Sequence, residues 1–375
     1  MLLLLPIAGL ASAPFISYHL RAASLLLRIE NPNSADPLAR YHTYQIGEAT
    51  SELPALFGKV RARTYTPLGM ADPPAMVVVH GVHHLGIDEP RLVAFSRALC
   101  ASGIKVFTPE IAQLADYRIT RSSIDLIGAI SVWYSQQIGK KVGLLGLSFA
   151  GGESLIVAAD PNYSKNLAFV VSIGGHYDMQ RVSEFYVTGQ IPRPDGSIYK
   201  MAPHEYGALV LVYSRPEEFF PAKDVPKITN ALKLLLWEQV DESKAAAQGM
   251  TPYSSAKLQK LYEHDRSMIA GELKSAILKH TKEMEEVSPK GKLKGVKIPV
   301  LLLHGVADDV IPATEMEWIE KEVPRQHLRG ALTSSLLSHV SIAGEPPWKD
   351  KMALVNFMSE LMKLVDESNQ EKLSN

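Results

Sequence analysis

The chain has 375 residues, which is enough for one large domain or two of ordinary size. Its hydrophobic content of 46% and charged content of 21% are typical of a globular protein with a sizeable core, not of a disordered chain. The formal net charge of -1, with no strongly basic segment, argues against a nucleic-acid partner. The single cysteine, Cys100, excludes an internal disulfide, and its apolar helical surroundings indicate a buried structural thiol.

Residues 1–30 form an apolar segment that resembles a signal peptide or a membrane anchor. Two features argue against a signal peptide: no lysine or arginine precedes the apolar run, and Pro14 would follow a cleavage after the small residues at 11–13. The run is also shorter than the roughly 20 residues of a spanning helix. Leucines and arginines between residues 20 and 28 favour a helix that lies on a membrane surface or on the protein itself. We therefore expect membrane association through this segment, on an undetermined side, with a cytoplasmic or an exported protein as the alternatives.

Short strands alternate with helices from residue 31 to residue 175. Alternating apolar and polar residues over 60–65 predict a half-buried edge strand, and continuous apolar runs predict buried strands. The expected buried strands are 76–79, 105–108, 142–147 and 167–173, and the expected helices are 90–101, a helix to Ile138 capped by Ser122 or Ser123, and 153–159. This order predicts an α/β fold with right-handed crossovers and a mostly parallel central sheet flanked by helices.

The pattern changes over residues 176–295, which contain few strand signals. Helical periodicity dominates there, including one apolar stripe formed by Ile228, Leu232, Leu235, Leu236 and Val240. The remaining expected elements are a solvated linker at 290–297, strands at 298–303 and 331–337, and a C-terminal helix. We therefore expect a mainly helical cap at 176–295, inserted into an α/β core whose two parts are residues 31–175 and 296–375.

The sequence Gly146-Leu147-Ser148-Phe149-Ala150-Gly151 lies between an expected buried strand and a helix. It follows the pattern G-x-S-x-G except that Ala150 takes the place of the last glycine. A serine on a tight strand-to-helix bend needs very small neighbours, and the helix N-terminus behind it favours developing negative charge. The pattern predicts that Ser148 is a nucleophile.

A serine hydroxyl is inert unless a base takes its proton. Of the twelve histidines, His339 is the expected general base, because it lies in the loop between the possible last strand and the C-terminal helix. His80 and His304 each end a strand immediately before a glycine, and we interpret both as turn-structuring residues.

The base in turn needs an acid that orients it. Asp308 and Asp309 follow the expected strand at 298–303, where either carboxylate could reach a histidine on the neighbouring loop. Asp178, in the loop after the strand that ends near residue 173, is a further alternative. The alternative for each of these aspartates is a structural role, in which the side chain caps a loop or a helix.

The first long strand ends in His80-Gly81-Val82-His83-His84. Backbone N–H groups of Val82, or else of His83, and of Phe149 would form an oxyanion hole there. The histidine cluster lacks the carboxylates and spacing of a zinc motif, so no metal site is expected.

From about residue 55 to residue 365 the sequence resembles an α/β-hydrolase, and it is similar to bacterial esterase, lipase and dienelactone-hydrolase-like members. The resemblance is carried by VVVHG at 77–81, GLSFAG at 146–151, HGVADDVIP at 304–312 and SH at 338–339, in the family's order of nucleophile, acid and histidine. It implies the α/β-hydrolase fold, a helical cap after the sixth strand, and Asp308 as the catalytic acid. Dienelactone hydrolases proper have a cysteine where Ser148 stands.

Together these residues predict a serine hydrolase that cleaves a small carboxylic ester through an acyl-enzyme intermediate, without a cofactor. His83, Tyr177, Phe185 and Tyr186 are the candidate substrate-binding residues. One alternative is an amide or peptide hydrolase with the same triad, and another is a non-catalytic binding protein on a hydrolase scaffold, which would predict a broken triad. Ser148 argues against a haloalkane dehalogenase or an epoxide hydrolase, because both need a carboxylate at that position.

Overall fold

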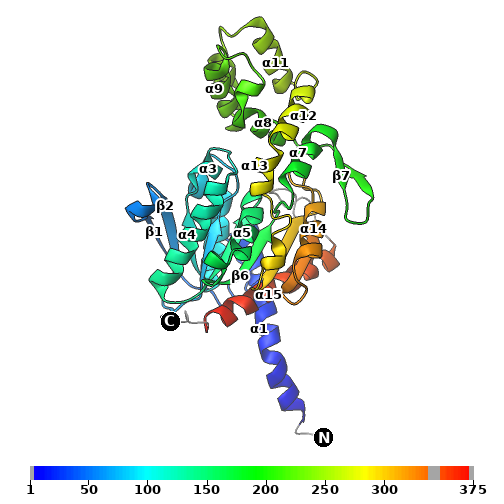
Figure 1. The fold of residues 1–375 in the computed structure, drawn as a ribbon. Coiled ribbons are helices and arrows are strands. Elements are labelled where there is room, and N and C mark those ends of the chain that lie inside the picture. Colours follow the sequence, from blue (N-terminus) through cyan, green and yellow to red (C-terminus); the bar gives the residue numbers. More distant parts are fainter. Residues whose placement is uncertain (1–3, 337–346, 371–375) are drawn as a thin grey trace.

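A computed structural model describes residues 4–336 and 347–370, with side chains from Phe15 onward. An eight-stranded sheet in the order β1-β2-β4-β3-β5-β6-β9-β10 forms its centre (Figure 1). Only β2 runs against the others, because it pairs antiparallel with both β1 and β4 while the remaining pairs are parallel. The strands are β1 (Ile46–Glu52), β2 (Arg61–Pro67), β3 (Ala75–Val79), β4 (Lys105–Pro109), β5 (Val142–Leu147), β6 (Leu167–Ile173), β9 (Val300–Gly305) and β10 (Leu328–Ser334). The predicted mostly parallel sheet is confirmed.

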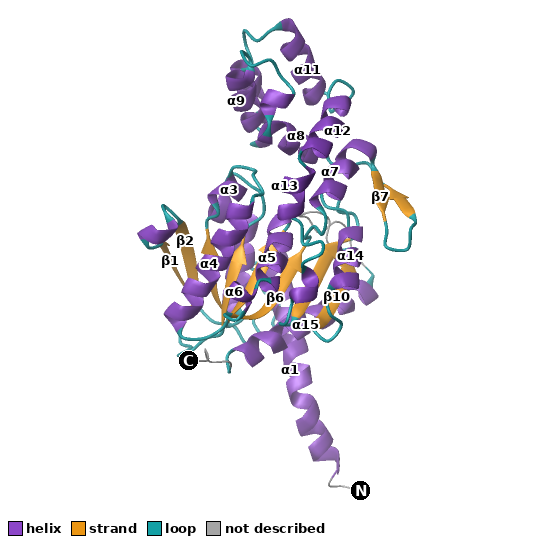
Figure 2. Ribbon diagram, viewed as in Figure 1, coloured by secondary structure: helices purple, strands orange, loops and turns teal. Residues whose placement is uncertain are grey.

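Helices cover both faces of the sheet (Figure 2). Because successive side chains of a strand point to opposite faces, Val77 and Val79 of β3 enter one hydrophobic cluster and Met76 and Val78 enter the other. The first cluster includes α4 and α5, and the second includes α1, α2 and α15. The helices of the core are α1 (Leu4–Glu30), α2 (Pro90–Ala101), α3 (Ala112–Ala115), α4 (Arg121–Ile138), α5 (Phe149–Ala159), α6 (Pro161–Ser164), α14 (Thr314–Glu322) and α15 (Trp348–Ser368).

The C-terminal half of α1 packs on the protein, whereas its N-terminal half projects away from it (Figure 1). Leu25 is fully buried, and the Arg21 guanidinium pairs with the Asp366 carboxylate of α15 at 2.6 Å. Burial lowers the pKa of Arg28 to about 10, and this side chain donates to the Ser102 hydroxyl at 2.6 Å. The arginines of this half therefore face the protein. In the described part of the chain, no helix combines the length and the apolar character that a membrane span requires.

A mainly helical segment lies between β6 and β9, and we call it the inserted segment (residues 176–295). It begins where β6 ends, so it stands at the carboxyl edge of the parallel strands (Figure 1). Ile228, Leu232 and Leu236 of the predicted stripe are buried, whereas Val240 begins the next helix and is 40% exposed. The elements of this segment are α7 (Met179–Thr188), β7 (Gln190–Pro192), β8 (Ile198–Lys200), α8 (Glu205–Ser214), α9 (Val225–Leu236), α10 (Val240–Ala246), α11 (Pro252–Tyr262), α12 (Ala270–Lys279) and α13 (Thr281–Glu286).

Two carboxylates of α14 hold the two ends of the inserted segment. Glu315 is buried and accepts the backbone N–H of Asp178 at 2.9 Å, where the segment begins. Glu322 accepts the backbone N–H of Leu293 at 2.9 Å, where the segment ends. The linker predicted at 290–297 is mostly exposed to solvent, as expected, but it is anchored to the core by the fully buried Leu293.

Several predicted boundaries also need correction. The strand predicted at 60–65 is not an edge strand, because β1 pairs outside it. The N-cap of α4 is Thr120 and not Ser122, and Ser123 serves as the reciprocal partner in a capping box. The last strand ends at Ser334, so the predicted range 331–337 was placed too late in the chain.

Candidate active site

Ser148 forms a strained turn between β5 and α5. Its backbone has φ 55° and ψ -132°, a conformation that non-glycine residues rarely adopt and that costs about 1–3 kcal/mol. The Ser148 N–H donates to the Ile173 carbonyl at 2.7 Å, and the Gly151 N–H donates to the Ser148 carbonyl at 2.8 Å. Because neighbouring elements fix the turn, the strain persists, as it does at nucleophile elbows. The serine also lies at the N-terminus of α5, where developing negative charge is favoured.

Gly146 is the position at which this turn requires glycine. A Cβ atom there would lie 2.1 Å from the Ala150 carbonyl oxygen, so no side chain fits without a backbone shift. Ala150 itself is fully buried, and its methyl group is accommodated. The alanine that departs from the sequence pattern is therefore compatible with the turn.

We expect the substitution Gly146→Ala to lower the free energy of unfolding by about 3 kcal/mol, because it overpacks the turn. The matched control is Gly271→Ala in α12, where a Cβ atom meets nothing within 4 Å and helix propensity favours alanine by about 0.5–1 kcal/mol. Urea denaturation of both variants measures the difference. Equal stability of Gly146→Ala and wild type would contradict this account of the turn.

Asp308 lies in the loop after β9 and is buried. Its Oδ1 accepts the backbone N–H groups of Val310 at 3.0 Å and Ile311 at 2.8 Å, so the loop fixes the carboxylate. His304 Nε2 lies 3.4 Å from Asp308 Oδ2 and donates to the Ile311 carbonyl at 2.8 Å. His304 thus holds the loop together, in agreement with its interpretation as a turn-structuring residue.

Gly174 lies between Ser148 and Asp308. It has φ 66°, and a Cβ atom there would be 3.9 Å from the Ser148 Cα and 3.6 Å from Asp308 Oδ2. On the other side of the serine, a Cβ atom on Gly81 would lie 3.2 Å from the Ser148 Cβ. The carboxyl ends of β3, β5, β6 and β9 therefore bring these residues to one place, as expected at the carboxyl edge of a parallel sheet.

The other two candidate acids have different surroundings. Asp178 is the N-cap of α7, where its Oδ1 accepts the Gln180 N–H at 3.1 Å, and its Oδ2 accepts from Lys290 at 2.8 Å. Asp309 is half-buried, and its carbonyl accepts the His204 N–H at 2.9 Å. Among the three, Asp308 is the one whose carboxylate lies beside Gly174. His339, the expected base, lies outside the described residues and stays a prediction.

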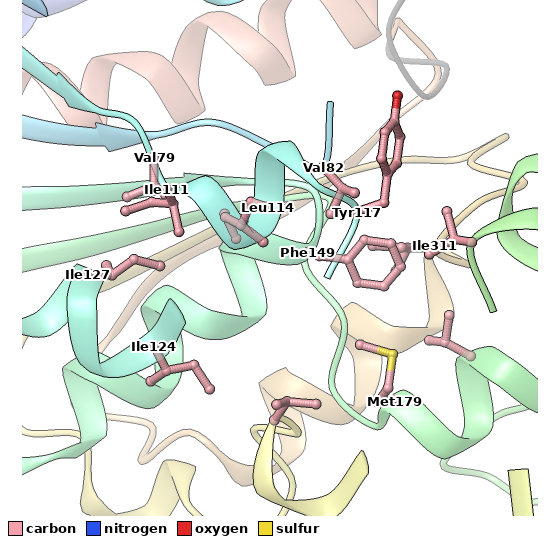
Figure 3. Packing of buried hydrophobic residues seen from close by; sticks show 14 of the residues in the cluster. Val79, Val82, Ile111, Leu114, Tyr117, Ile124, Ile127, Phe149, Met179 and Ile311 are labelled. Atoms are coloured by element: carbon pink, nitrogen blue, oxygen red, sulfur yellow. The ribbon is translucent and has the colours of Figure 1, made fainter. Parts of the chain in front are cut away.

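Val82 and Phe149, the expected oxyanion-hole residues, have buried side chains in one hydrophobic cluster (Figure 3). Phe149 is the first residue of α5, and Val82 follows Gly81. The neighbouring His83 ring stacks on His84 at 4.7 Å, and the His84 ring stacks on Trp237 of the inserted segment at 4.9 Å. Burial lowers the pKa of His83 and of His84. The loop after β3 is thereby tied to the inserted segment.

His80 has both ring nitrogens engaged. The Ile111 N–H donates to His80 Nε2 at 3.0 Å, so the ring proton lies on Nδ1, which donates to the Gly81 carbonyl at 2.7 Å. Burial lowers the pKa of His80, which keeps the ring neutral. Within residues 4–336 and 347–370, no three histidine, cysteine or acidic side chains are grouped so as to hold a metal ion.

The aromatic residues predicted to bind substrate are buried in α7 or just before it. Tyr177 is 8% exposed, and its hydroxyl donates to the Glu322 carboxylate at 2.6 Å. Phe185 and Tyr186 are 1% and 2% exposed. All three belong to the hydrophobic cluster that includes Phe149. Their role in substrate binding stays a prediction.

Glu153, in α5, is a buried carboxyl group that sequence reasoning did not single out. The Ser123 hydroxyl donates to its Oε1 at 2.5 Å, and burial raises its pKa to about 8. The folded protein therefore holds a proton that the unfolded chain releases above the ordinary glutamate pKa. Ionisation of Glu153 would place a buried charge between α5 and the first turn of α4.

We expect the stability contributed by this proton to be present at pH 5 and to be lost as the pH rises to about 8. The free energy of unfolding of wild type, relative to Glu153→Gln, should fall by on the order of 4 kcal/mol over that range. The variant keeps an acceptor for Ser123 but does not titrate. Urea denaturation of both proteins at several pH values measures the change, and a constant difference would contradict the buried neutral carboxyl.

The strand order, the single reversed strand and the strained serine between β5 and α5 define the α/β-hydrolase fold. No protein-family model and no curated protein sequence matches the chain.

Among solved structures, the chain is similar to the 2,6-dihydroxy-pseudo-oxynicotine hydrolase, with 15% identity and a TM-score of 0.46 over 87% of this chain and 68% of that one. It is similar to a putative lipase from Acinetobacter baumannii, with 13% identity and a TM-score of 0.46 over 86% and 93% of the two chains. It is also similar to brefeldin A esterase, with 11% identity and a TM-score of 0.46 over 93% of this chain and 83% of that one. These likenesses are weak, and the fold follows from the strand order itself.

Proposed function

We propose that the protein is a serine hydrolase that cleaves carboxylic esters through an acyl-enzyme intermediate. The observation that carries the proposal is the strained backbone of Ser148 at the N-terminus of α5, with the fixed carboxylate of Asp308 on the far side of Gly174. Strain of this kind is retained where the surrounding structure holds a residue for chemistry. No cofactor is needed for this reaction.

In the proposed reaction, His339 takes the proton of the Ser148 hydroxyl as its oxygen attacks the ester carbonyl carbon. The N–H groups of Val82 and Phe149 stabilise the oxyanion of the tetrahedral intermediate. The alcohol leaves with the proton from His339, and the acyl group stays on Ser148. Water, deprotonated by His339, then attacks the acyl carbonyl, and the acid is released as His339 returns the proton to the Ser148 oxygen. Asp308 holds the imidazole in the tautomer that accepts the serine proton.

The inserted segment is proposed to act as a cap that shapes the acyl or alcohol pocket. It begins at the carboxyl edge, where Ser148 lies, and Glu315 and Glu322 hold its two ends. Candidate pocket residues remain His83, Tyr177, Phe185 and Tyr186.

A panel of p-nitrophenyl esters of increasing chain length, with p-nitroanilides of the same acids, tests the reaction class. We expect turnover of esters and a chain-length optimum that reflects the pocket. Turnover of the anilides alone would favour an amide or peptide hydrolase. A folded wild type that cleaves neither series would contradict the proposed function.

We also propose that the N-terminal part of α1 binds a membrane surface. Its sequence over residues 1–18 contains no charged residue, and Figure 1 shows this part projecting from the end of the molecule opposite the inserted segment. An apolar stretch of this kind is stabilised by burial in the lipid interface. Flotation of the full chain with liposomes tests the proposal, and a chain that stays with the soluble fraction at all lipid compositions would contradict it.

A further inference from the structure

A tyrosine of the inserted segment contacts the loop that carries the proposed oxyanion hole. The hydroxyl of Tyr206, in the first turn of α8, donates to the Val82 carbonyl at 2.8 Å, although 124 residues separate the two in the chain. Burial raises the pKa of Tyr206 well above its usual range, so the hydroxyl remains a donor. The Tyr206 ring lies beside the ring of Tyr117, with centroids 5.9 Å apart.

Hydrogen bonds fix both of the peptide groups that flank the Cα atom of Val82. The carbonyl of Gly81, which shares a peptide plane with the Val82 N–H, accepts from His80 Nδ1 at 2.7 Å. The carbonyl of Val82, in the next peptide plane, accepts from Tyr206. Because a residue has only two soft backbone dihedrals, fixing both flanking planes fixes the direction of the Val82 N–H. His80 belongs to the same loop, whereas Tyr206 reaches it from the inserted segment.

The start of α8 also contacts the acid loop. The His204 N–H donates to the Asp309 carbonyl at 2.9 Å, next to Asp308. The packing of α8 leaves it little room to shift, since a Cβ atom on Gly207 would lie 2.3 Å from the Tyr186 ring. One short stretch of the inserted segment thus bridges the oxyanion loop and the acid loop.

We propose that Tyr206 is a positioning residue for the oxyanion hole, so that docking of the inserted segment sets the direction of the Val82 N–H. This inference rests on the proposed function. It makes the inserted segment part of the transition-state machinery, beyond any contact that it makes with the substrate. Its effect should therefore appear in kcat and in the binding of tetrahedral adducts, with KM little changed, because the oxyanion forms only as the reaction proceeds.

The substitution Tyr206→Phe removes the hydroxyl and keeps the ring contact with Tyr117. The matched control is Tyr213→Phe on the same helix, whose hydroxyl donates to the Asp116 carboxylate at 2.8 Å, away from the oxyanion loop. We expect Tyr206→Phe to lower kcat for p-nitrophenyl esters about tenfold, with KM within about twofold of wild type. Its affinity for an alkyl boronic acid, which forms a tetrahedral adduct with the serine, should fall by the same factor. The control should stay within about twofold in all three quantities.

Thermal unfolding of both variants establishes that they are folded under the assay conditions. An unchanged kcat and boronic acid affinity in Tyr206→Phe, or an equal loss in Tyr213→Phe, would overturn the positioning role. A change confined to KM would also overturn it, since that result indicates a ground-state contact. A folded wild type without turnover would contradict the proposed function itself, whereas an active wild type matched by Tyr206→Phe would overturn only this inference.

Discussion

Replacing Ser148 by alanine is expected to lower kcat for ester hydrolysis by roughly 10⁶-fold, the scale of loss when the nucleophile of a serine triad is removed. Alanine adopts the same strained backbone at no additional cost, so the variant should fold like wild type. Steady-state turnover of a p-nitrophenyl ester, with circular dichroism as the check on folding, measures the loss. Turnover within about tenfold of wild type would contradict the nucleophile assignment.

A second variant, Ser148→Gly, separates the effect of backbone strain on stability from the effect of the hydroxyl group on turnover. Ser148→Gly also removes the nucleophile, but glycine adopts φ 55° and ψ -132° readily. We expect its free energy of unfolding to exceed that of Ser148→Ala by about 1–2 kcal/mol. Equal stability of the two variants would show that the turn stores no strain. A gain in stability with complete loss of turnover is the trade-off expected at a catalytic site.

Replacing Asp308 by asparagine is expected to have the second large effect on kcat. If Asp308 orients the general base, asparagine favours the wrong imidazole tautomer and should lower kcat by roughly 10⁴-fold at neutral pH. Asparagine keeps an oxygen that can accept the N–H groups of Val310 and Ile311, so the loop should retain its conformation. The measurement is kcat as a function of pH for wild type and variant.

Asp309→Asn is the matched control, because it makes the same chemical change at the next residue. Its kcat is expected to stay within about threefold of wild type. A large loss of kcat in Asp309→Asn, together with an active Asp308→Asn, would assign the role of the catalytic acid to Asp309. A large loss in Asp178→Asn with both loop variants active would instead place the acid at the start of α7.

Most of the sheet could be predicted because its strands are buried on both faces and are therefore continuous apolar runs. β1, with the sequence IGEATSE, escaped prediction because it is largely exposed and lies at the edge of the sheet, where no apolar pattern is needed. The range 290–297 is largely exposed, as its lysines indicate. Its anchoring could not be predicted, because the backbone at Leu293 is fixed by Glu322, which lies in a later helix.

At the candidate site, the residues that could be predicted from the sequence are those that belong to local patterns. Ser148 and Asp308 each follow a buried strand within a short motif, and the structure places Gly174 between them. Tyr206 carries no such pattern, because its contact with Val82 depends on how the inserted segment folds back over the carboxyl edge. Glu153 is the one acidic residue in the mostly apolar α5, and only its burial indicates that it is neutral.

If the backbone around Ser148 holds a reactive nucleophile, a fluorophosphonate should label the folded chain at that residue. Peptide mass mapping of the labelled protein is expected to find one covalent adduct, on the peptide that contains Ser148, and no adduct in Ser148→Ala. A folded wild type that takes up no label, or an adduct that persists in Ser148→Ala, would contradict the assignment of Ser148 as the nucleophile.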